Sequence, residues 1–193
     1  INIERMRNEF IDEQIRRQNH YVGFYEELDN TMESIENIFT EPSETGIIHF
    51  VDQFFDSWQN LANNPSDISA RTMVKTNAEI LIDVFHNVAG ELANLRQTKN
   101  EEIQQQVNKV NEICKEIYNL NLEIGTVELN NQNANDSRDR RDLLLKDLSK
   151  IIDISVIEND IGQVTVTTSG NIIVSPVSYQ GLETTSVTTR LSD

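Results

Sequence analysis

The residues that could carry chemistry are few in this sequence of 193 residues, and their spacing does not assemble a site. The three histidines, His20, His49 and His86, lie far apart, and none stands in the paired spacing of a zinc site. The acidic pairs Glu26–Glu27 and Glu101–Glu102 have no histidine three residues further on, which a di-metal site in a helical bundle would need. These patterns predict no catalytic residue, no metal site and no bound cofactor.

The remaining sequence motifs for chemistry are weak. The turn at Asn159 to Gly162 lacks the acidic spacing of a calcium loop, and the chain has neither a glycine-rich phosphate loop nor a nucleophile elbow. The tripeptide at 135–137 matches a glycosylation acceptor, a pattern that often arises by chance. The only cysteine, Cys114, stands in an apolar stripe and is predicted to be a buried small hydrophobe. Nothing in the sequence predicts an enzyme.

The charge balance limits the possible partners. The chain has 32 acidic and 16 basic residues, a formal net charge of -16, and no basic run that offsets it. Such a surface repels nucleic acid and anionic lipid, so neither is expected as a partner. No apolar run reaches the length of a membrane span. The one charge-dense cluster, Arg138 to Asp142, alternates in sign, which is typical of a solvated helix start.

The stretch from Ser66 to about Leu129 must position most of the fold. It contains no proline, and its apolar residues recur at alternating steps of 4 and 3, which is the heptad spacing of packed helices. The stripe comprises Val74, Ala78, Leu81, Phe85, Val88, Leu92 and Leu95, and then Ile103, Val107, Val110, Cys114, Ile117, Asn121 and Ile124. The step of eight between Leu95 and Ile103 is a stutter, which predicts a nearly straight rod.

The other elements are expected to fold back on this rod. We predict helices at about 3–39, 46–62, 66–129 and 138–150, which together form a helical rod domain over residues 1–150. The predicted fold class is mainly α: an elongated antiparallel helical bundle with a very long central helix, followed by a small β-rich portion. The aromatic stripe of the second helix, which includes Phe54 and Trp58, is expected to lie in the core.

A sharp corner is expected where the second and third helices meet. Pro65 ends the second helix, because proline disfavours helical dihedrals in the residue before it. Ser66 is the expected cap of the long helix, with Asp67 in its first turn. Asp67 and Arg71 are four residues apart and are expected to form an ion pair.

The hydrophobic period changes from that of a helix to that of a strand after Ile151. Apolar residues then alternate with polar ones up to Val174, with turn residues at 159–162 and 169–171. This is the pattern of a β-meander. Residues 151–193 are therefore predicted to form a β-meander and the start of an outer β-rich domain.

Several blocks of sequence resemble those of one known family. The first is Leu61 to Asp67 with Ala70–Arg71, followed by an apolar helix, and the second runs from Val107 to Ile124. The third comprises Asn135–Asp136 and Arg141 to Ser149, followed by a strand and a turn at Gly162. In this order the blocks resemble flagellar hook-associated protein 1, the hook-filament junction protein of bacteria.

The resemblance implies a function. It implies a structural subunit of the bacterial flagellum that assembles into an axial tube, and a chain that represents the central part of such a subunit without its terminal helices. The implied partners are identical subunits, the hook protein, the second junction protein and an export chaperone that binds through the missing C-terminus. The implied location is extracellular, after export through the flagellar secretion apparatus without a cleaved signal peptide. This central fragment alone is expected to be a monomer.

Two other classes of protein remain open from the residues. One is a related axial protein, either flagellin or the second junction protein, since these also use long paired helices. The other is a coiled-coil adaptor that dimerises through the stripe from residue 74 to 124. Sedimentation distinguishes the bundle from the adaptor, because a bundle folded on itself gives a compact monomer, whereas the adaptor gives an elongated dimer.

Overall fold

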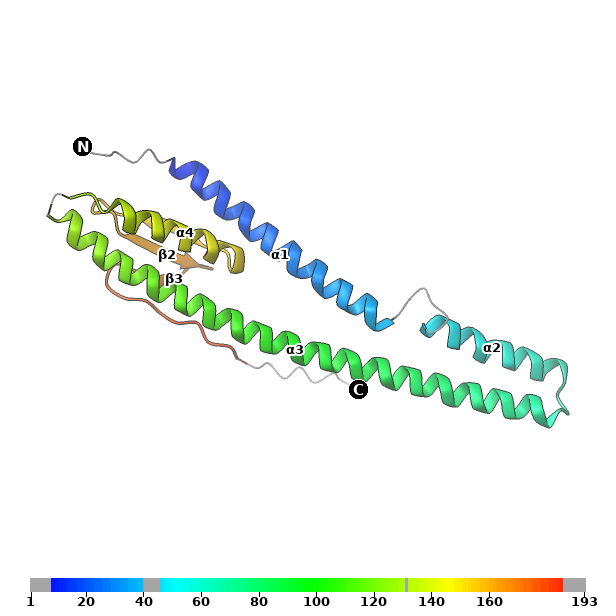
Figure 1. The fold of residues 1–193 in the computed structure, drawn as a ribbon. Coiled ribbons are helices and arrows are strands. Elements are labelled where there is room, and N and C mark those ends of the chain that lie inside the picture. Colours follow the sequence, from blue (N-terminus) through cyan, green and yellow to red (C-terminus); the bar gives the residue numbers. More distant parts are fainter. Residues whose placement is uncertain (1–7, 40–45, 131, 186–193) are drawn as a thin grey trace. The chain divides into compact units, whose positions relative to one another are not determined.

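The computed structural model describes residues 8–39, 46–130 and 132–185 and confirms a mainly α fold followed by a small sheet (Figure 1). The predicted helical residues 3–7 and the C-terminal residues 186–193 lie outside the described residues. The elements in chain order are α1 (Glu9–Phe39), α2 (Ile47–Asn63), α3 (Ile68–Glu128), α4 (Asn135–Ile151), β1 (Ser155–Glu158), β2 (Val164–Thr168) and β3 (Asn171–Val174).

The chain divides into two compact units. One comprises Ile1–Glu27 together with Glu101–Asp193, and the other comprises Leu28–Asn100. We call them the sheet unit and the helical unit. α3 contributes to both, and its 61 residues form one helix without interruption through the stutter between Leu95 and Ile103. At ~1.5 Å per residue, α3 is about 90 Å long. The predicted division at residue 150 between a rod domain and an outer domain stays a prediction.

The sheet unit has a complete hydrophobic core. The three strands form an antiparallel sheet in the order β1-β2-β3. The inward residues of β2, Val164 and Val166, are fully buried and share one core with residues of α3 and α4. The remaining buried members of this core are Val110, Ile113, Cys114, Ile117, Leu145, Leu148, Ile154, Ile173 and Val174. The sheet and the two helices therefore stabilise one another.

The strands follow the predicted meander. β1 pairs with β2 so that Val156 stands opposite Val166. The turn between β2 and β3 holds Ser169 and Gly170 at positive φ angles of 48° and 81°. Glycine adopts this left-handed conformation without the steric cost that other residues incur. The predicted turn at residues 169–171 is confirmed.

The helical unit is packed less completely. The side chain of Asn77 on α3 donates to the backbone oxygen of Gln53 on α2 at 3.1 Å, which ties the two helices together. The aromatic stripe of α2 is only partly in the core: Phe54 is half-buried, but Trp58 is 49% exposed. Trp58 packs edge-on against Phe54, with ring centroids 6.3 Å apart. The prediction that the whole stripe is buried was therefore wrong for Trp58, because the described helices of this unit do not enclose it.

The corner between α2 and α3 differs from the prediction in two details. α3 begins at Ile68, and the capping group is the carboxylate of Asp67, which accepts a hydrogen bond from the Ser69 amide at 2.8 Å. Ser66 lies one residue too early to cap this helix. The guanidinium of Arg71 donates to the carbonyl oxygen of Pro65 at 2.8 and 3.3 Å. Within the part of the chain that the structure describes, no ion pair joins Asp67 to Arg71, because both side chains bond to backbone groups instead.

Candidate functional site: a clasp of buried charges at the end of α3

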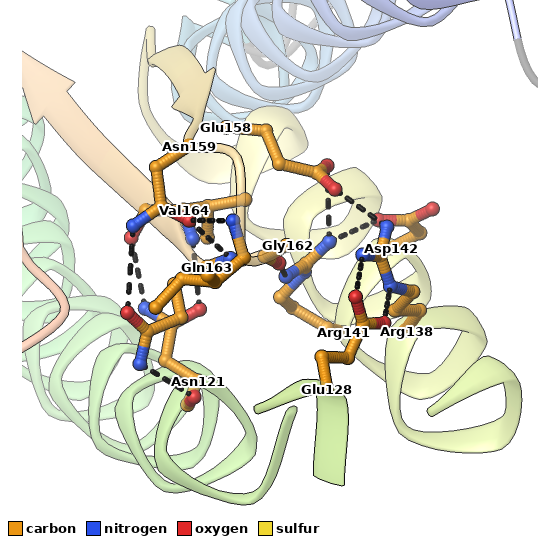
Figure 2. A network of polar contacts seen from close by, with 11 residues as sticks. Asn121, Glu128, Arg138, Arg141, Asp142, Glu158, Asn159, Gly162, Gln163 and Val164 are labelled. Carbon is orange, nitrogen blue, oxygen red and sulfur yellow. Dashed lines mark hydrogen bonds and ion pairs between the residues drawn. The ribbon is translucent and has the colours of Figure 1, made fainter. Parts of the chain in front are cut away.

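A cluster of polar contacts in the sheet unit joins the end of α3, the start of α4 and the turn between β1 and β2 (Figure 2). We call it the clasp and define it by Glu128, Arg138, Arg141, Glu158 and Gly162. Each element supplies a part: Glu128 ends α3, the two arginines lie on one face of α4 three residues apart, and Glu158 ends β1. Side chains three apart on a helix are neighbours, so both arginines can reach the same turn.

Arg138 is the bridge of the clasp. Its Nε and Nη2 atoms donate to Oε1 and Oε2 of Glu128 at 2.6 and 2.7 Å. Its Nη1 atom donates to Oε1 of Glu158 at 2.6 Å. The pairing with Glu128 is bidentate, which is the strongest geometry of an arginine and a carboxylate. Arg138 thereby connects the last turn of α3 to the end of β1.

Arg141 is the buried member of the clasp. Its side chain is 0% exposed, and its Nη2 atom lies 3.2 Å from Oε2 of Glu158. Its Nη1 atom donates to the carbonyl oxygen of Gly162. A buried guanidinium is strongly destabilising when its partner is removed, since the remaining charge has no solvent. The geometry therefore makes Arg141 and Glu158 mutually dependent.

The pair of Glu128 and Arg138 is held in its ionised form. The hydrogen bond from Arg138 is the main reason that the pKa of Glu128 lies below its ordinary value, although partial burial opposes this effect. Conversely, the hydrogen bond to Glu128 is the main reason that the pKa of Arg138 lies above its ordinary value. All four charged side chains of the clasp are engaged with one another. The arrangement is that of a structural joint, in which each charged group is occupied by a partner.

Gly162 is required at the turn for two reasons. Its φ angle of +74° lies in the left-handed region that favours glycine. A Cβ atom at this position would also collide with Nη2 of Arg138. The neighbouring Asn159 closes the turn, because its backbone amide donates to Gln163 and its carbonyl accepts from Gly162, at 2.9 and 3.0 Å. Any side chain at residue 162 would displace the bridging arginine.

Asn121 connects α3 to the sheet beside the clasp (Figure 2). Its Nδ2 atom donates to the carbonyl oxygen of Val164 at 2.8 Å, and its Oδ1 atom accepts from the Val164 amide at 3.0 Å. The side chain is 0% exposed. It thus satisfies both backbone groups at the start of β2, as a neighbouring strand would. The sequence did contain a signal for this role, because Asn121 is the one polar residue in an otherwise apolar second half of the stripe.

The prediction of a solvated helix start at Arg138 to Asp142 was wrong for the two residues that matter most. Asp139 and Arg140 are exposed as expected, but Arg141 is buried and the Arg138 side chain is only 20% exposed. Charge alternation alone could not show this, because the acidic partners, Glu128 and Glu158, lie on other elements. The helical period does place residues 138 and 141 on one face, and that spacing was the available clue.

The other candidate residues are not assembled into a site. His20 stacks at a tilt beside Tyr21 on α1, the ring of His49 lies 2.9 Å from the Gln53 amide on α2, and His86 is exposed on α3. The pairs Glu26–Glu27 and Glu101–Glu102 lie on α1 and α3 respectively. Across the described ranges, no group of three or more histidine, cysteine or acidic side chains is placed to hold a metal ion.

Cys114 lies in the core, as predicted. It is 1% exposed, and burial raises the pKa of its thiol to about 11. A thiol with so high a pKa is almost entirely protonated at neutral pH and is a poor nucleophile. None of the described helices is both long enough and apolar enough to cross a bilayer.

Comparisons with known proteins show which family the chain belongs to. The family described as "Flagellar hook-associated protein FlgK helical domain" matches residues 32–192 of the chain. The chain belongs to the FlgK family. The resemblance found in the sequence blocks is thereby confirmed, and the matched range includes α2, α3, α4 and the sheet.

Individual relatives agree with this assignment. Flagellar hook-associated protein 1 of Bacillus subtilis is 31% identical over 160 residues, which is 83% of this chain and 32% of that protein. Flagellar hook-associated protein 1 of Salmonella typhimurium is 30% identical over 168 residues, which is 86% of this chain and 30% of that protein. The chain thus spans about a third of the length of these FlgK relatives.

A solved structure shares the fold. The flagellar hook junction protein FlgK from Burkholderia pseudomallei superposes with a TM-score of 0.68 at 23% identity. The match covers 88% of this chain and 30% of that one. At this identity the likeness concerns the fold, and it supports a long helix followed by a small sheet as the common framework of the FlgK helical domain.

Proposed function

We propose that this chain supplies the helical part of a structural subunit that joins hook to filament in the bacterial flagellum. Membership of the FlgK family carries the proposal, since two FlgK relatives are named as hook-associated proteins and a third as a hook junction protein. In this role the chain acts by packing and performs no catalysis. Its neighbours in the junction are identical subunits, the hook protein and the second junction protein.

The physical properties of the chain suit such a role. A subunit of an open-ended tube makes contacts with two different surfaces of its neighbours, which requires apolar surface beyond its own core. The helices here carry large apolar side chains that are more than a third exposed, among them Phe24, Tyr25, Phe55 and Phe85. α3 is one helix of 61 residues along which such contacts can be distributed.

The clasp would keep the end of α3 rigid under load. A joint that transmits torque between two polymers must not open at the point where its long helix turns back. In the sheet unit that point lies where α3 ends at Glu128, and the bidentate pair of Arg138 with Glu128 and the buried Arg141 hold it closed. We expect loss of these ion pairs to weaken the junction by destabilising the subunit itself. The surfaces that contact neighbouring subunits should be unchanged.

Location and delivery follow from the same proposal. The subunit is extracellular in the flagellum and is exported through the flagellar secretion apparatus without a cleaved signal peptide. An export chaperone would bind a part of the subunit that lies outside this chain. The chain alone is expected to be monomeric, which sedimentation velocity can test.

The competing functions are less well supported. A coiled-coil adaptor would dimerise through the stripe from residue 74 to 124, but Val110, Ile117 and Ile124 of that stripe are already buried within the sheet unit. A flagellin or the second junction protein is disfavoured because the matched family and relatives are hook-associated protein 1.

Deletion of the gene and complementation with full-length variants test the proposal. Cells that lack the protein should form hooks but no attached filaments, and the wild-type gene should restore both filaments and swimming. An Arg141→Ala gene should restore fewer filaments than an Arg140→Ala gene, because only Arg141 belongs to the clasp. Normal filaments on cells that lack the protein would contradict the proposal.

A further inference from the structure

The residues that follow β3 lie along α3 as an extended segment, which we call the strap and define as residues 175–185 (Figure 1). Its first part still belongs to the sheet: Tyr179 bridges to Val174, and the Gln180 amide donates to the Ile173 carbonyl oxygen at 2.9 Å. In the described part of the chain, no strand pairs with the residues after Gln180. Their backbone must therefore be held by something other than a sheet.

Asn111 on α3 holds the strap at Leu182. Its Nδ2 atom donates to the Leu182 carbonyl oxygen at 2.9 Å, and its Oδ1 atom accepts from the Leu182 amide at 2.7 Å. The primary amide of one side chain thus replaces both hydrogen bonds that a neighbouring strand would make. The side chain of Leu182 in turn packs, half-buried, against the core of the sheet unit.

The contacts on either side of Asn111 occur at heptad spacing. The ring of Tyr118 lies against the ring of Tyr179 with centroids 5.5 Å apart, and Gln104 accepts a hydrogen bond from Thr184 at 2.5 Å. Positions 118, 111 and 104 are seven residues apart and share one face of α3. One heptad rises about 10.5 Å along a helix, and three extended residues span about 10 Å. The step from Tyr179 to Leu182 therefore matches one heptad of α3 in the antiparallel direction.

A comparison with Asn121 shows how firmly the strap is held. Asn121 uses the same two-point geometry on Val164, but it is fully buried and its strand continues into the sheet. Asn111 is only partly buried, and most of the strap around Leu182 is exposed. Partly solvated contacts can exchange with water at low cost, whereas a buried unpaired amide is expensive. The two clamps share a geometry and differ in how easily they open.

We propose that the strap is a releasable element for which Asn111 is the catch, and that it opens while the sheet and helices of the sheet unit stay folded. In the closed state Asn111 fixes the direction in which the chain leaves the sheet unit, antiparallel to α3. In the open state the chain is free after Gln180, where its pairing with the sheet ends, and the core surface beneath Leu182 is uncovered. The proposal concerns a movable element of this chain and does not depend on the flagellar role.

Hydrogen exchange of the 193-residue chain tests this proposal, with Asn111→Ala compared with wild type. Asn119→Ala is the matched control, because Asn119 is an exposed asparagine on the same helix. We expect Asn111→Ala to speed exchange of the Leu182 amide by about tenfold or more and to leave the β2 amides of Val164 and Val166 within about twofold of wild type. Asn119→Ala should change neither.

Three results would overturn the proposal. The Leu182 amide could exchange at the wild-type rate in Asn111→Ala, so that Asn111 is not the catch. The β2 amides could lose protection together with Leu182, so that the strap is an integral part of the fold. Asn119→Ala could match Asn111→Ala, so that the effect is not specific.

A second variant covers the case in which Asn111→Ala does not fold. Asn111→Asp keeps an oxygen that accepts from the Leu182 amide, but it removes the Nδ2 donor to the Leu182 carbonyl oxygen. At neutral pH its Leu182 amide should exchange faster than in wild type and more slowly than with both bonds lost. A wild-type exchange rate in Asn111→Asp would show that the Nδ2 hydrogen bond does not hold the strap, and it would contradict the proposal.

Discussion

The two halves of α3 carry the same apolar spacing and have different surroundings. In the second half, Val110, Ile117 and Ile124 are at most 1% exposed, within the shared core of α3, α4 and the sheet or beside it. In the first half, Phe85 is 50% exposed although it occupies a position of the same stripe, and Ile103, the first stripe residue after the stutter, is 54% exposed. Heptad spacing determines which side of a helix is apolar. It does not determine whether another element covers that side.

This difference suggests a division of labour along one helix. From Val110 onward the stripe of the second half is covered within the sheet unit, and the clasp and Asn121 fix the end of α3 to α4 and β2. The first half retains apolar surface that its own unit does not cover. In a subunit that is built into a tube, such surface would serve contacts with neighbours, whereas the covered part of the second half would supply rigidity.

The largest effect is expected at the clasp. Arg141→Ala removes a fully buried charge and leaves Glu158 and the Gly162 carbonyl oxygen without that partner. We expect a loss of about 3 to 5 kcal/mol in the free energy of unfolding, measured by urea denaturation with circular dichroism. Arg140→Ala, on the exposed side of α4, should change it by about 0.5 kcal/mol or less. Equal effects of the two variants would show that the clasp does not stabilise the fold.

Two isoleucines of the stripe, both in the second half of α3, compare a covered position with an uncovered one. Ile117→Ala deletes a side chain that is 0% exposed and should cost about 2 to 5 kcal/mol in the free energy of unfolding. Ile103→Ala deletes the same atoms where the side chain is 54% exposed, and it should cost about 1 kcal/mol or less. Urea denaturation of the two variants gives the difference. Similar costs would mean that Ile103 is covered in solution.

Two helix glycines give a smaller contrast of opposite sign. A Cβ at Gly23 on α1 would collide with the backbone oxygen of Lys150 at the end of α4, so Gly23→Ala must push the helices apart. We expect it to lower the free energy of unfolding by about 1 to 3 kcal/mol. A Cβ at Gly90 on α3 would have no neighbouring atom within 4 Å, and Gly90→Ala should raise that free energy by about 0.5 to 1 kcal/mol through helix propensity. Thermal unfolding of both variants decides between these signs.

The smallest effect concerns pH. The pKa of Glu128 lies below its ordinary value of 4.5 because Arg138 donates to its carboxylate. The folded state therefore binds this proton less readily than the unfolded state, so the stabilisation is present above pH 4.5 and is lost as the pH falls through the lowered pKa. Glu128→Gln should flatten the dependence of the unfolding midpoint on pH below 4.5. An unchanged pH profile would contradict the role assigned to this carboxylate.

Local periodicity was sufficient to predict the helices and the meander. The absence of proline and the unbroken stripe predicted α3, and the change of period after Ile151 predicted the strands. The buried position of Cys114 followed from its neighbours in the stripe, Val110 and Ile117. These features depend on residues that are close in sequence, so one chain was enough to find them.

The clasp could not be predicted in the same way, because its partners are distant in sequence. Arg138 reaches Glu158 over 20 residues, and Asn121 reaches Val164 over 43. A run of alternating charges looks the same in the sequence whether or not a carboxylate from a distant element pairs with its arginines. The extent of exposure at Trp58 was missed for a related reason, since an apolar stripe does not reveal whether the chain supplies its cover.

Hydrogen exchange along α3 tests the contrast between its two halves most directly. If the second half has a complete core of its own, the amides of residues 110–124 should exchange at least about 100-fold more slowly than those of residues 76–95 in the isolated chain. Protection that is equal along the whole helix would show that both halves are covered alike, and it would contradict the account.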